Sequence, residues 1–138
     1  MRLYVLDASA WLRLFLGDGP AVPGLTEAAL MVERGSAAFI APELVVIEVA
    51  HALIRKVRLN LISLEEQQQI WLDMRSMPME LCGTEQHVES AIQLALTHNL
   101  SVYDALYLAL AFNVGATLFT ADTKLASVAR TVGNTGNL

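Results

Sequence analysis

The chain has 138 residues, of which 54% are hydrophobic and 17% charged, and 9 Lys and Arg against 14 Asp and Glu give a formal charge of −5. This composition excludes a disordered chain, the length suits one domain over residues 1–138, and the longest uncharged window, 105–121, is marginal for crossing a bilayer. The single cysteine, Cys82, excludes an internal disulfide and favours a reducing compartment, so we expect a soluble, cytoplasmic protein whose excess apolar content also covers a subunit interface.

Strand-like and helix-like segments alternate along the first half of the chain. We expect a strand over Arg2–Leu6, a helix over Ala8–Leu16, a loop over Gly17–Gly24, a helix over about Leu25–Glu33 and a strand over Ala38–Ala41. Pro42 is expected to begin a long helix that ends at about Arg58, because proline is well tolerated in a first helical turn.

The second half continues this alternation. Ser63 is expected to cap a helix that stops before Pro78, with Glu66 completing a capping box. The further expected elements are a strand over Met79–Leu81, a helix capped by Thr84 that reaches His98–Asn99, a helix capped by Ser101 that ends at about Asn113, a strand over Ala116–Thr120, a helix from Asp122 to near Arg130 and a loose tail over Gly133–Leu138. Short apolar strands that alternate with amphipathic helices predict an α/β fold of three layers, with a parallel sheet of about four to five strands covered on both faces.

Asp7 follows the first expected strand, at the carboxyl end, where open α/β sheets bind their ligands. A helix N-cap is a sufficient structural role for an aspartate at this place, so capping and chemistry both stay open for Asp7. Ser9, two residues later, has a hydroxyl that can hold the Asp7 carboxylate or a bound water.

Glu48 is harder to explain as a structural residue. It lies in the segment 44–50, which contains no other charge, and its neighbours at helical spacing are apolar. A carboxylate that faces a core is unfavourable unless it is protonated or paired, and Arg55 and Lys56 are the candidate partners. The pattern favours a functional role for Glu48.

Two further acids lie at the starts of helices. Ser101-x-x-Asp104 is similar to a capping box, and the helix dipole also favours an acid in a first turn, but the rest of that helix is uncharged. Asp122 follows the last expected strand, and capping the last helix is a sufficient local reason for it. Thr120 can present its hydroxyl toward the same space.

Together, these four acids are expected to lie at or just beyond the carboxyl edge of one parallel sheet. Carboxylates that lie close to one another repel unless a cation lies between them. Oxygen ligands without a cluster of Cys or His suit Mg²⁺ or Mn²⁺ better than Zn²⁺. Leaving out these four acids changes the formal charge from −5 to −1, so the acidity of the chain is largely that of the candidate site.

Four segments resemble, in order, the landmarks of the PIN-domain nucleases, over essentially the whole chain. They are Val5-Leu6-Asp7-Ala8-Ser9-Ala10, Pro42-x-Leu44 followed by Glu48, Tyr103-Asp104-Ala105-x-Tyr107-Leu108-Ala109-Leu110-Ala111 and Thr120-Ala121-Asp122. The opening motif is weak by itself, the Tyr-Asp-Ala stretch is fairly specific, and the ordered set of four acids is strong. The chain is most similar to the small, single-domain VapC-like toxins of toxin–antitoxin pairs.

This resemblance implies a Mg²⁺-dependent endoribonuclease with carboxylates as metal ligands. The acidic positions of the family fall on Asp7, Glu48, Asp104 and Asp122, with Ser9 and Thr120 as polar supports. Asp7 and Asp104 would be direct metal ligands, whereas Glu48 and Asp122 would bind a second ion or orient the attacking water.

The resemblance also implies a parallel sheet in the strand order 3-2-1-4-5, a homodimer, and a small antitoxin whose tail occupies the active-site groove. The C-terminal stretch is short for the last of these strands. One departure is His51, where relatives often carry Asn. We favour a core position for His51 over a hydrogen bond near the site.

The RNA substrate would have to approach an acidic protein. Arg55, Lys56 and Arg58 lie at the end of the helix that carries Glu48, although the helix dipole alone would also favour them there. Arg13 and Lys124 closely follow two of the acids. Contacts from these residues to phosphates would confer a salt-dependent affinity without sequence preference.

Two other functions stay open. A phosphatase that uses Asp7 as a covalent nucleophile usually has a second acid two residues later, where this chain has Ser9. A non-catalytic RNA- or protein-binding module on the same fold has no reason to retain four repelling charges.

Overall fold

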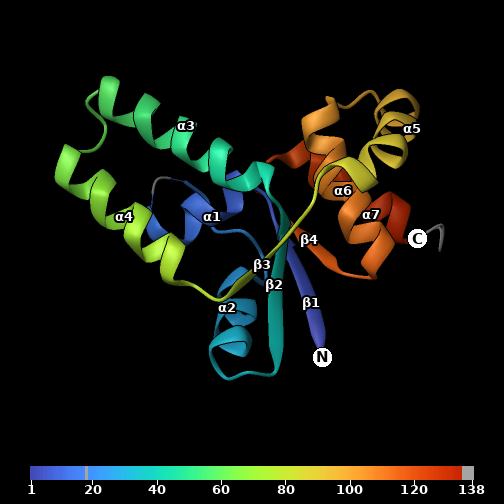
Figure 1. The fold of residues 1–138 in the computed structure, drawn as a ribbon, viewed down its shortest axis with the longest axis horizontal. Helices are drawn as coiled ribbons and strands as arrows, with labels where there is room; N and C mark the ends of the chain where they lie inside the picture. The colour runs from blue at the N-terminus through green and yellow to red at the C-terminus, as the bar shows by residue number, and fades with distance from the viewer. Residues whose placement is uncertain (18, 135–138) are drawn as a thin grey trace.

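A parallel sheet of four strands lies at the centre of the computed structural model, which describes residues 1–17 and 19–134 (Figure 1). The strands are β1 (Arg2–Leu6), β2 (Ala37–Pro42), β3 (Met79–Cys82) and β4 (Thr117–Phe119), in the spatial order β3-β2-β1-β4. Val5 of β1 lies opposite Ile40 of β2 and Leu118 of β4, and every neighbouring pair is parallel. The carboxyl ends of the strands therefore meet at one edge of the sheet.

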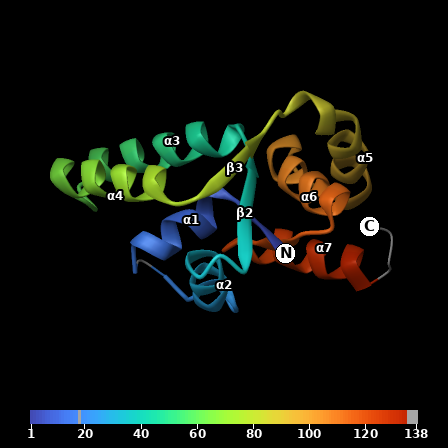
Figure 2. The ribbon, with the colours of Figure 1, turned by 60° about the horizontal axis from the view of Figure 1, so that its bottom comes forward.

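Helices cover both faces of the sheet, which confirms the predicted three-layer α/β fold (Figures 1 and 2). They are α1 (Ala8–Phe15), α2 (Leu25–Glu33), α3 (Leu44–Arg58), α4 (Leu64–Ser76), α5 (Val88–His98), α6 (Val102–Val114) and α7 (Thr123–Asn134), with a short 3₁₀ helix over Glu85–His87. α6 packs against β1 and β2 with α5 behind it, whereas α1 and α2 lie on the other side and α3 and α4 extend outward as a pair. Over the described residues, no helix has both the length and the hydropathy that crossing a membrane requires.

The core fixes the central strand and the helix that follows it. Val5 of β1 and Trp11 of α1 have no exposed surface. The Trp11 ring meets Phe39 of β2 edge-on, with ring centroids 5.2 Å apart, and such a pair adds about 0.5–1.5 kcal/mol to the gain from burial. Tyr107 of α6 belongs to the same core. Asp7, which joins β1 to α1, is therefore held between two buried elements.

Local side-chain signals set several of the helix ends as expected. The Ser63 hydroxyl accepts the backbone N–H of Glu66 while the Glu66 carboxylate accepts that of Ser63, which is the predicted capping box. Ser101 begins α6 by accepting the N–H of Asp104 at 3.1 Å. Gly115, in the left-handed region with φ 69°, ends the same helix.

Two expected helix starts are wrong. Pro42 is the last residue of β2 rather than a first helical residue, because the sheet continues to the pair Pro42 and Cys82, and α3 begins at Leu44. Thr84 does not cap a helix, because its own backbone is helical and its hydroxyl makes no capping bond; the 3₁₀ helix intervenes and α5 begins at Val88.

The last helix is longer than expected. α7 continues past Arg130 to Asn134, because Val132 is buried with Leu125 and prolongs the apolar face of the helix. The first two residues of the expected loose tail are thus helical, and the rest of that tail, 135–138, lies outside the described residues.

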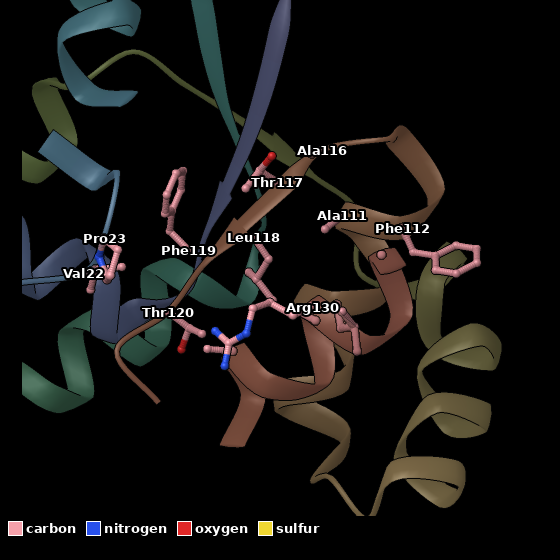
Figure 3. A pocket seen from close by; sticks show the side chains of 14 residues that line it. Val22, Pro23, Ala111, Phe112, Ala116, Thr117, Leu118, Phe119, Thr120 and Arg130 are labelled. Carbon is pink, nitrogen blue, oxygen red and sulfur yellow. The ribbon is translucent and has the colours of Figure 1, made fainter. Parts of the chain in front are cut away.

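The four strands agree with the first four of the order implied by the resemblance, and β4 is the edge strand within the described part of the chain. Beside this edge lies a hollow of about 390 Å³, bounded by β4, α6, α7 and the loop at Val22 and Pro23 (Figure 3). Leu118, Phe119 and Thr120 line it. The fifth strand that the resemblance implies would pair with β4, on this side of the sheet.

Candidate active site

The carboxyl edge of the sheet gathers the four acids that the sequence singles out. Asp7 follows β1, Asp122 lies three residues after β4, Glu48 is the fifth residue of α3 and Asp104 the third of α6. Burial is the main cause that raises the pKa of Glu48 and of Asp104, and neighbouring charges add to it: Asp7 and Asp104 act on Glu48, and Asp122 and Asp7 act on Asp104. The four carboxylates therefore form one electrostatic cluster.

Asp7 is the most buried acid of the cluster, with 6% of its surface exposed. Its Oδ1 accepts hydrogen bonds from Ser9 Oγ at 2.6 Å and from the N–H of Ala10 at 2.9 Å, and its Oδ2 accepts one from Thr120 Oγ1 at 2.5 Å. Burial raises the pKa of Asp7, these three hydrogen bonds oppose the rise, and the charge of Asp122 adds to it. Asp7 thus caps α1 and also faces the other acids.

Ser9 and Thr120 join two separate parts of the chain at this carboxylate. The Ser9 hydroxyl accepts the N–H of Ala121 at 2.9 Å, and the Thr120 hydroxyl accepts the N–H of Asp122 at 3.0 Å. Each hydroxyl oxygen accepts a backbone N–H and donates its own hydrogen to Asp7, because an ionised carboxylate can only accept. The junction of β1 with α1 is therefore tied to the junction of β4 with α7.

Glu48 is half-buried, and the structure gives it a partner that differs from those we expected. The hydroxyl of Tyr107 on α6 donates a short hydrogen bond to Glu48 Oε1, whereas we considered Arg55 and Lys56. This bond opposes the rise in the pKa of Glu48 that burial causes. The half-buried carboxylate is thus compensated by a neutral donor from another helix.

The expected core position of His51 is wrong. His51 lies on the exposed side of α3, one turn after Glu48, and its charge lowers the pKa of that carboxyl. The buried positions of α3 are Val45, Val49 and Leu53, at a spacing of four residues, and His51 lies off this line.

Asp104 is half-buried at the start of α6. Besides the effects of burial, Asp122 and Asp7, a hydrogen bond with the Ser101 side chain and the charge of Lys124 act on the pKa of Asp104, and both lower it. Lys124 Nζ donates to the backbone oxygen of Asn99 at 2.5 Å, which holds the ammonium near this acid.

Asp122 is exposed, and its Oδ1 accepts the N–H groups of Lys124 at 2.9 Å and of Leu125 at 3.1 Å. Asp122 therefore caps α7, as its local sequence predicts. Its charge also raises the pKa of Asp7 and the pKa of Asp104.

The cations that the sequence singles out lie at three different places. Arg13 Nη1 donates to the backbone oxygen of Pro20 at 2.9 Å, so its guanidinium lies over the loop before α2. Arg55 and Arg58 are exposed at the end of α3, and Lys56 between them is half-buried. The end of α3 lies roughly 15 Å along the helix from Glu48 at 1.5 Å per residue. Lys124 lies beside Asp104, whose pKa its charge lowers.

The donor set of the cluster fits a hard divalent cation, because it consists of carboxylate oxygens. Among the residues that the structure describes, no three Asp, Glu, His or Cys side chains stand closely enough together to enclose a metal ion. Mg²⁺ usually takes only one or two protein carboxylates, with water and substrate phosphate as its other ligands. A centre with Asp7 and one neighbouring acid as direct ligands therefore fits the side chains.

Tyr107 is the residue of the cluster to which sequence reasoning assigned no role. A signal for it exists in the sequence, because Tyr107 carries a polar hydroxyl in the middle of a helix whose only other polar side chain after the first turn is that of Asn113. A buried phenol needs a hydrogen-bond partner, and Glu48 is a half-buried acid with the same need. Their pairing could not be located without knowing how α3 and α6 meet.

The chain matches a known protein family and a known relative. The family model described as the PIN domain matches residues 4–131. Over 128 residues, the chain is 36% identical to Ribonuclease VapC1 of Mycobacterium tuberculosis (strain CDC 1551 / Oshkosh), an alignment that covers 89% of this chain and 88% of the relative.

Three solved structures resemble the fold. PAE2754 from Pyrobaculum aerophilum has a TM-score of 0.71 and 20% identity, over 92% of this chain and 79% of that one. Mycobacterium tuberculosis VapC20, described as a sarcin–ricin-loop-cleaving toxin, has a TM-score of 0.61 and 14% identity, over 90% and 93%. VapBC2 from Rickettsia felis, bound to a DNA fragment from its promoter, has a TM-score of 0.61 and 15% identity, over 91% and 92%. At these identities the likeness is one of fold.

Proposed function

This chain belongs to the PIN domain family, and from that membership we propose that it is an endoribonuclease, the toxin of a VapBC-type toxin–antitoxin pair. The reaction is hydrolysis of RNA phosphodiester bonds. The observation that carries the proposal is the single electrostatic cluster of Asp7, Glu48, Asp104 and Asp122 at the carboxyl edge of the sheet. The name of the relative at 36% identity, a ribonuclease, supports the same chemistry.

The four acids divide into two proposed roles. Asp7 and Asp104 are the direct ligands of Mg²⁺ or Mn²⁺, and Glu48 and Asp122 bind a second ion or orient the attacking water. When bound, the cation lowers the pKa of water and neutralises charge that develops on the phosphodiester oxygens. The carboxylates supply negative charge where that cation is needed, so no His or Lys base is required.

The supporting residues prepare the site before any cation binds. Ser9 and Thr120 each donate to a different oxygen of Asp7, which restricts the rotation of that carboxylate. Burial and mutual repulsion raise the pKa values of Asp7, Glu48 and Asp104, so ionising all three is unfavourable in the protein alone. In their ionised forms these three carboxylates would hold a divalent cation, and its binding would relieve the repulsion between them.

The proposed contacts to RNA phosphates are Arg13, Arg55, Lys56, Arg58 and Lys124. Lys124 would act near the scissile phosphate, because its charge reaches Asp104. The residues on α3 would bind phosphates farther along the RNA strand. A hollow of about 340 Å³ lies on this part of the protein, between His51 and the turn that follows α3. Such contacts confer affinity that falls with salt.

The two rival functions are less well supported. In a phosphatase, Asp7 would attack phosphorus, but both of its oxygens are engaged by Ser9, Ala10 and Thr120, and such bonds weaken a nucleophile. A non-catalytic binding module would have no use for four mutually repelling acids at one sheet edge.

The proposal also includes a homodimer, a cognate antitoxin protein and a cytoplasmic place of action. Large apolar side chains on α3, on α4 and on the turn between them are 47–68% exposed, which favours protein contacts there. They are Ile47, Ile54, Leu59, Leu61, Leu64 and Leu72. The cytoplasm is where cellular RNA and a newly made antitoxin would meet the enzyme.

A cleavage assay on structured RNA tests the proposed function. Wild-type protein should cleave in Mg²⁺, whereas Asp7→Asn and wild-type protein with excess EDTA should not. Cleavage that survives EDTA contradicts the metal mechanism, and a stable phospho-enzyme favours the phosphatase. Purified antitoxin should suppress the cleavage at equal molar ratio.

A further inference from the structure

We propose that Tyr107 is a positioning residue of the reaction, whose hydroxyl holds Glu48 toward Asp7 and Asp104. The inference rests on the proposed function and adds to it a residue from outside the acidic set. The hydrogen bond from the Tyr107 hydroxyl to Glu48 Oε1 joins residues 59 positions apart. It connects α6 to α3, two helices that approach the sheet edge from opposite sides (Figure 1).

The surroundings of Tyr107 fix where its hydroxyl points. The side chain is 1% exposed and belongs to the main core, so its ring cannot turn away without repacking the core. The charges of Glu48, Asp7 and Asp104 all raise the pKa of the Tyr107 hydroxyl, so this hydroxyl lies at the acid cluster. A rigid aromatic ring thus delivers one donor to one point of the site.

The effect on Glu48 follows from the length of its side chain. A glutamate has three rotatable bonds and loses conformational freedom when it binds a cation or a water. With Oε1 held by Tyr107, that freedom is already lost, and Oε2 is left for a ligand. Because partners that orient metal ligands typically contribute 10–100-fold to metal affinity or activity, removal of this hydroxyl should be measurable.

A purely structural role is the alternative, since a buried hydroxyl needs a partner for stability alone. Tyr4 offers a matched control, because it is another buried tyrosine of the core, 6% exposed, whose hydroxyl donates to Met31 Sδ at 3.4 Å. Tyr4→Phe removes a buried hydroxyl outside the acid cluster. Any effect that is particular to the site should therefore appear in Tyr107→Phe and be absent from Tyr4→Phe.

The experiment is a double-mutant cycle with Tyr107→Phe, Glu48→Gln and both together, beside Tyr4→Phe. Each protein is assayed for its Mn²⁺ dissociation constant by calorimetric titration, and for kcat and KM on RNA. Tyr107→Phe should weaken Mn²⁺ binding by about tenfold or more and lower kcat by a similar factor, with KM unchanged. In the Glu48→Gln background, the same change should have no further effect on either quantity.

The outcomes separate this inference from the proposed function. Wild-type values for Tyr107→Phe, an equal loss in both backgrounds, or a Tyr107→Phe protein that fails to fold while Glu48→Gln folds would each overturn the positioning role. If the wild-type protein binds Mn²⁺ in a Tyr107-dependent way yet cleaves no RNA, the proposed function fails and the positioning of a metal ligand stands. If it neither binds Mn²⁺ nor cleaves RNA, both proposals fail.

Discussion

Thr120 Oγ1 donates a hydrogen bond of 2.5 Å to Asp7 Oδ2, although 113 positions separate the two residues in the chain. The same hydroxyl accepts the N–H of Asp122 at 3.0 Å, so one small side chain connects two acids of the cluster. Thr120 is 6% exposed, so water cannot easily replace either bond.

Replacing Thr120 with valine should therefore destabilise the protein by about 1–3 kcal/mol, because the shape is retained while a buried carboxylate oxygen of Asp7 and the partly buried N–H of Asp122 lose their partner. Urea denaturation measures the loss. Thr120→Ser should recover most of it. Thr117→Val, at an exposed position of β4, is the control, and an equal effect there would contradict the role assigned to the Thr120 hydroxyl.

Without metal, the acid cluster should make the protein less stable as pH rises. The pKa values of Asp7, Glu48 and Asp104 are raised above their ordinary values of 3.8 for Asp and 4.5 for Glu, so the folded state keeps protons that the unfolded chain has released. Their contribution is fully present below about pH 4 and is lost as pH rises through the raised values. Denaturation of metal-free protein between pH 4 and 7 should show this slope.

The slope should become smaller in Asp104→Asn, which removes one of the three raised carboxyls. Glu65→Gln removes a charge from the exposed first turn of α4 and controls for the change in net charge. A slope that is the same in wild type and Asp104→Asn would show that Asp104 does not contribute to the pH dependence.

Divalent metal should raise the Tm of the wild-type protein. A ligand that binds only the folded state stabilises it by about 2.7 kcal/mol at a hundredfold excess over Kd. Thermal scans in millimolar Mg²⁺ or Mn²⁺ should show the increase, and Asp7→Asn should lose most of it. The same scan in buffer with EDTA and no added divalent metal gives the baseline Tm. An unchanged Tm in the wild-type protein would argue against a metal site at these acids.

Asp104→Asn should abolish cleavage while leaving the metal-free protein as stable as the wild type or more so. The cap of α6 is the hydroxyl of Ser101, which accepts the backbone N–H of residue 104 and does not need its carboxylate. Ser101→Ala should instead cost about 1 kcal/mol through loss of the cap. A large loss of stability in Asp104→Asn would reveal a capping role for Asp104.

Arg55→Ala should weaken RNA binding more than it changes kcat. Arg55 lines the hollow on α3 and lies about 10 Å along the helix from Glu48 at 1.5 Å per residue. Each phosphate contact that is lost should reduce the slope of log affinity against log salt by about 1, which filter binding with the inactive Asp7→Asn protein can measure. Arg34→Ala, at the end of α2, is the control, and an equal loss there would indicate non-specific attraction.

The sequence predicted much of the fold because its signals are local. Caps such as Ser63 and Ser101 and the alternation of apolar segments do not depend on the rest of the molecule, and the three-layer fold and the PIN family are both confirmed. The Thr84 cap was wrong because a 3₁₀ helix intervenes between that residue and α5.

The details of the site depended on contacts that no local pattern contains. On α3, apolar residues occur both on the buried line of Val49 and Leu53 and on the exposed side, where Ile47 is 68% exposed. Hydrophobicity alone therefore could not tell which way Glu48 and His51 face. The direction of these side chains is set by the packing of α3 on α1 and by the contact of α3 with α6.

The bond between Thr120 and Asp7 also sets an order of events during synthesis, since a chain grows from its N-terminus and this acid leaves the ribosome long before its partner. Until β4 and the start of α7 have been translated, Asp7 lacks the donor to Oδ2 and Asp122 is absent. A nascent chain that has not yet reached these residues therefore carries an incomplete acid cluster.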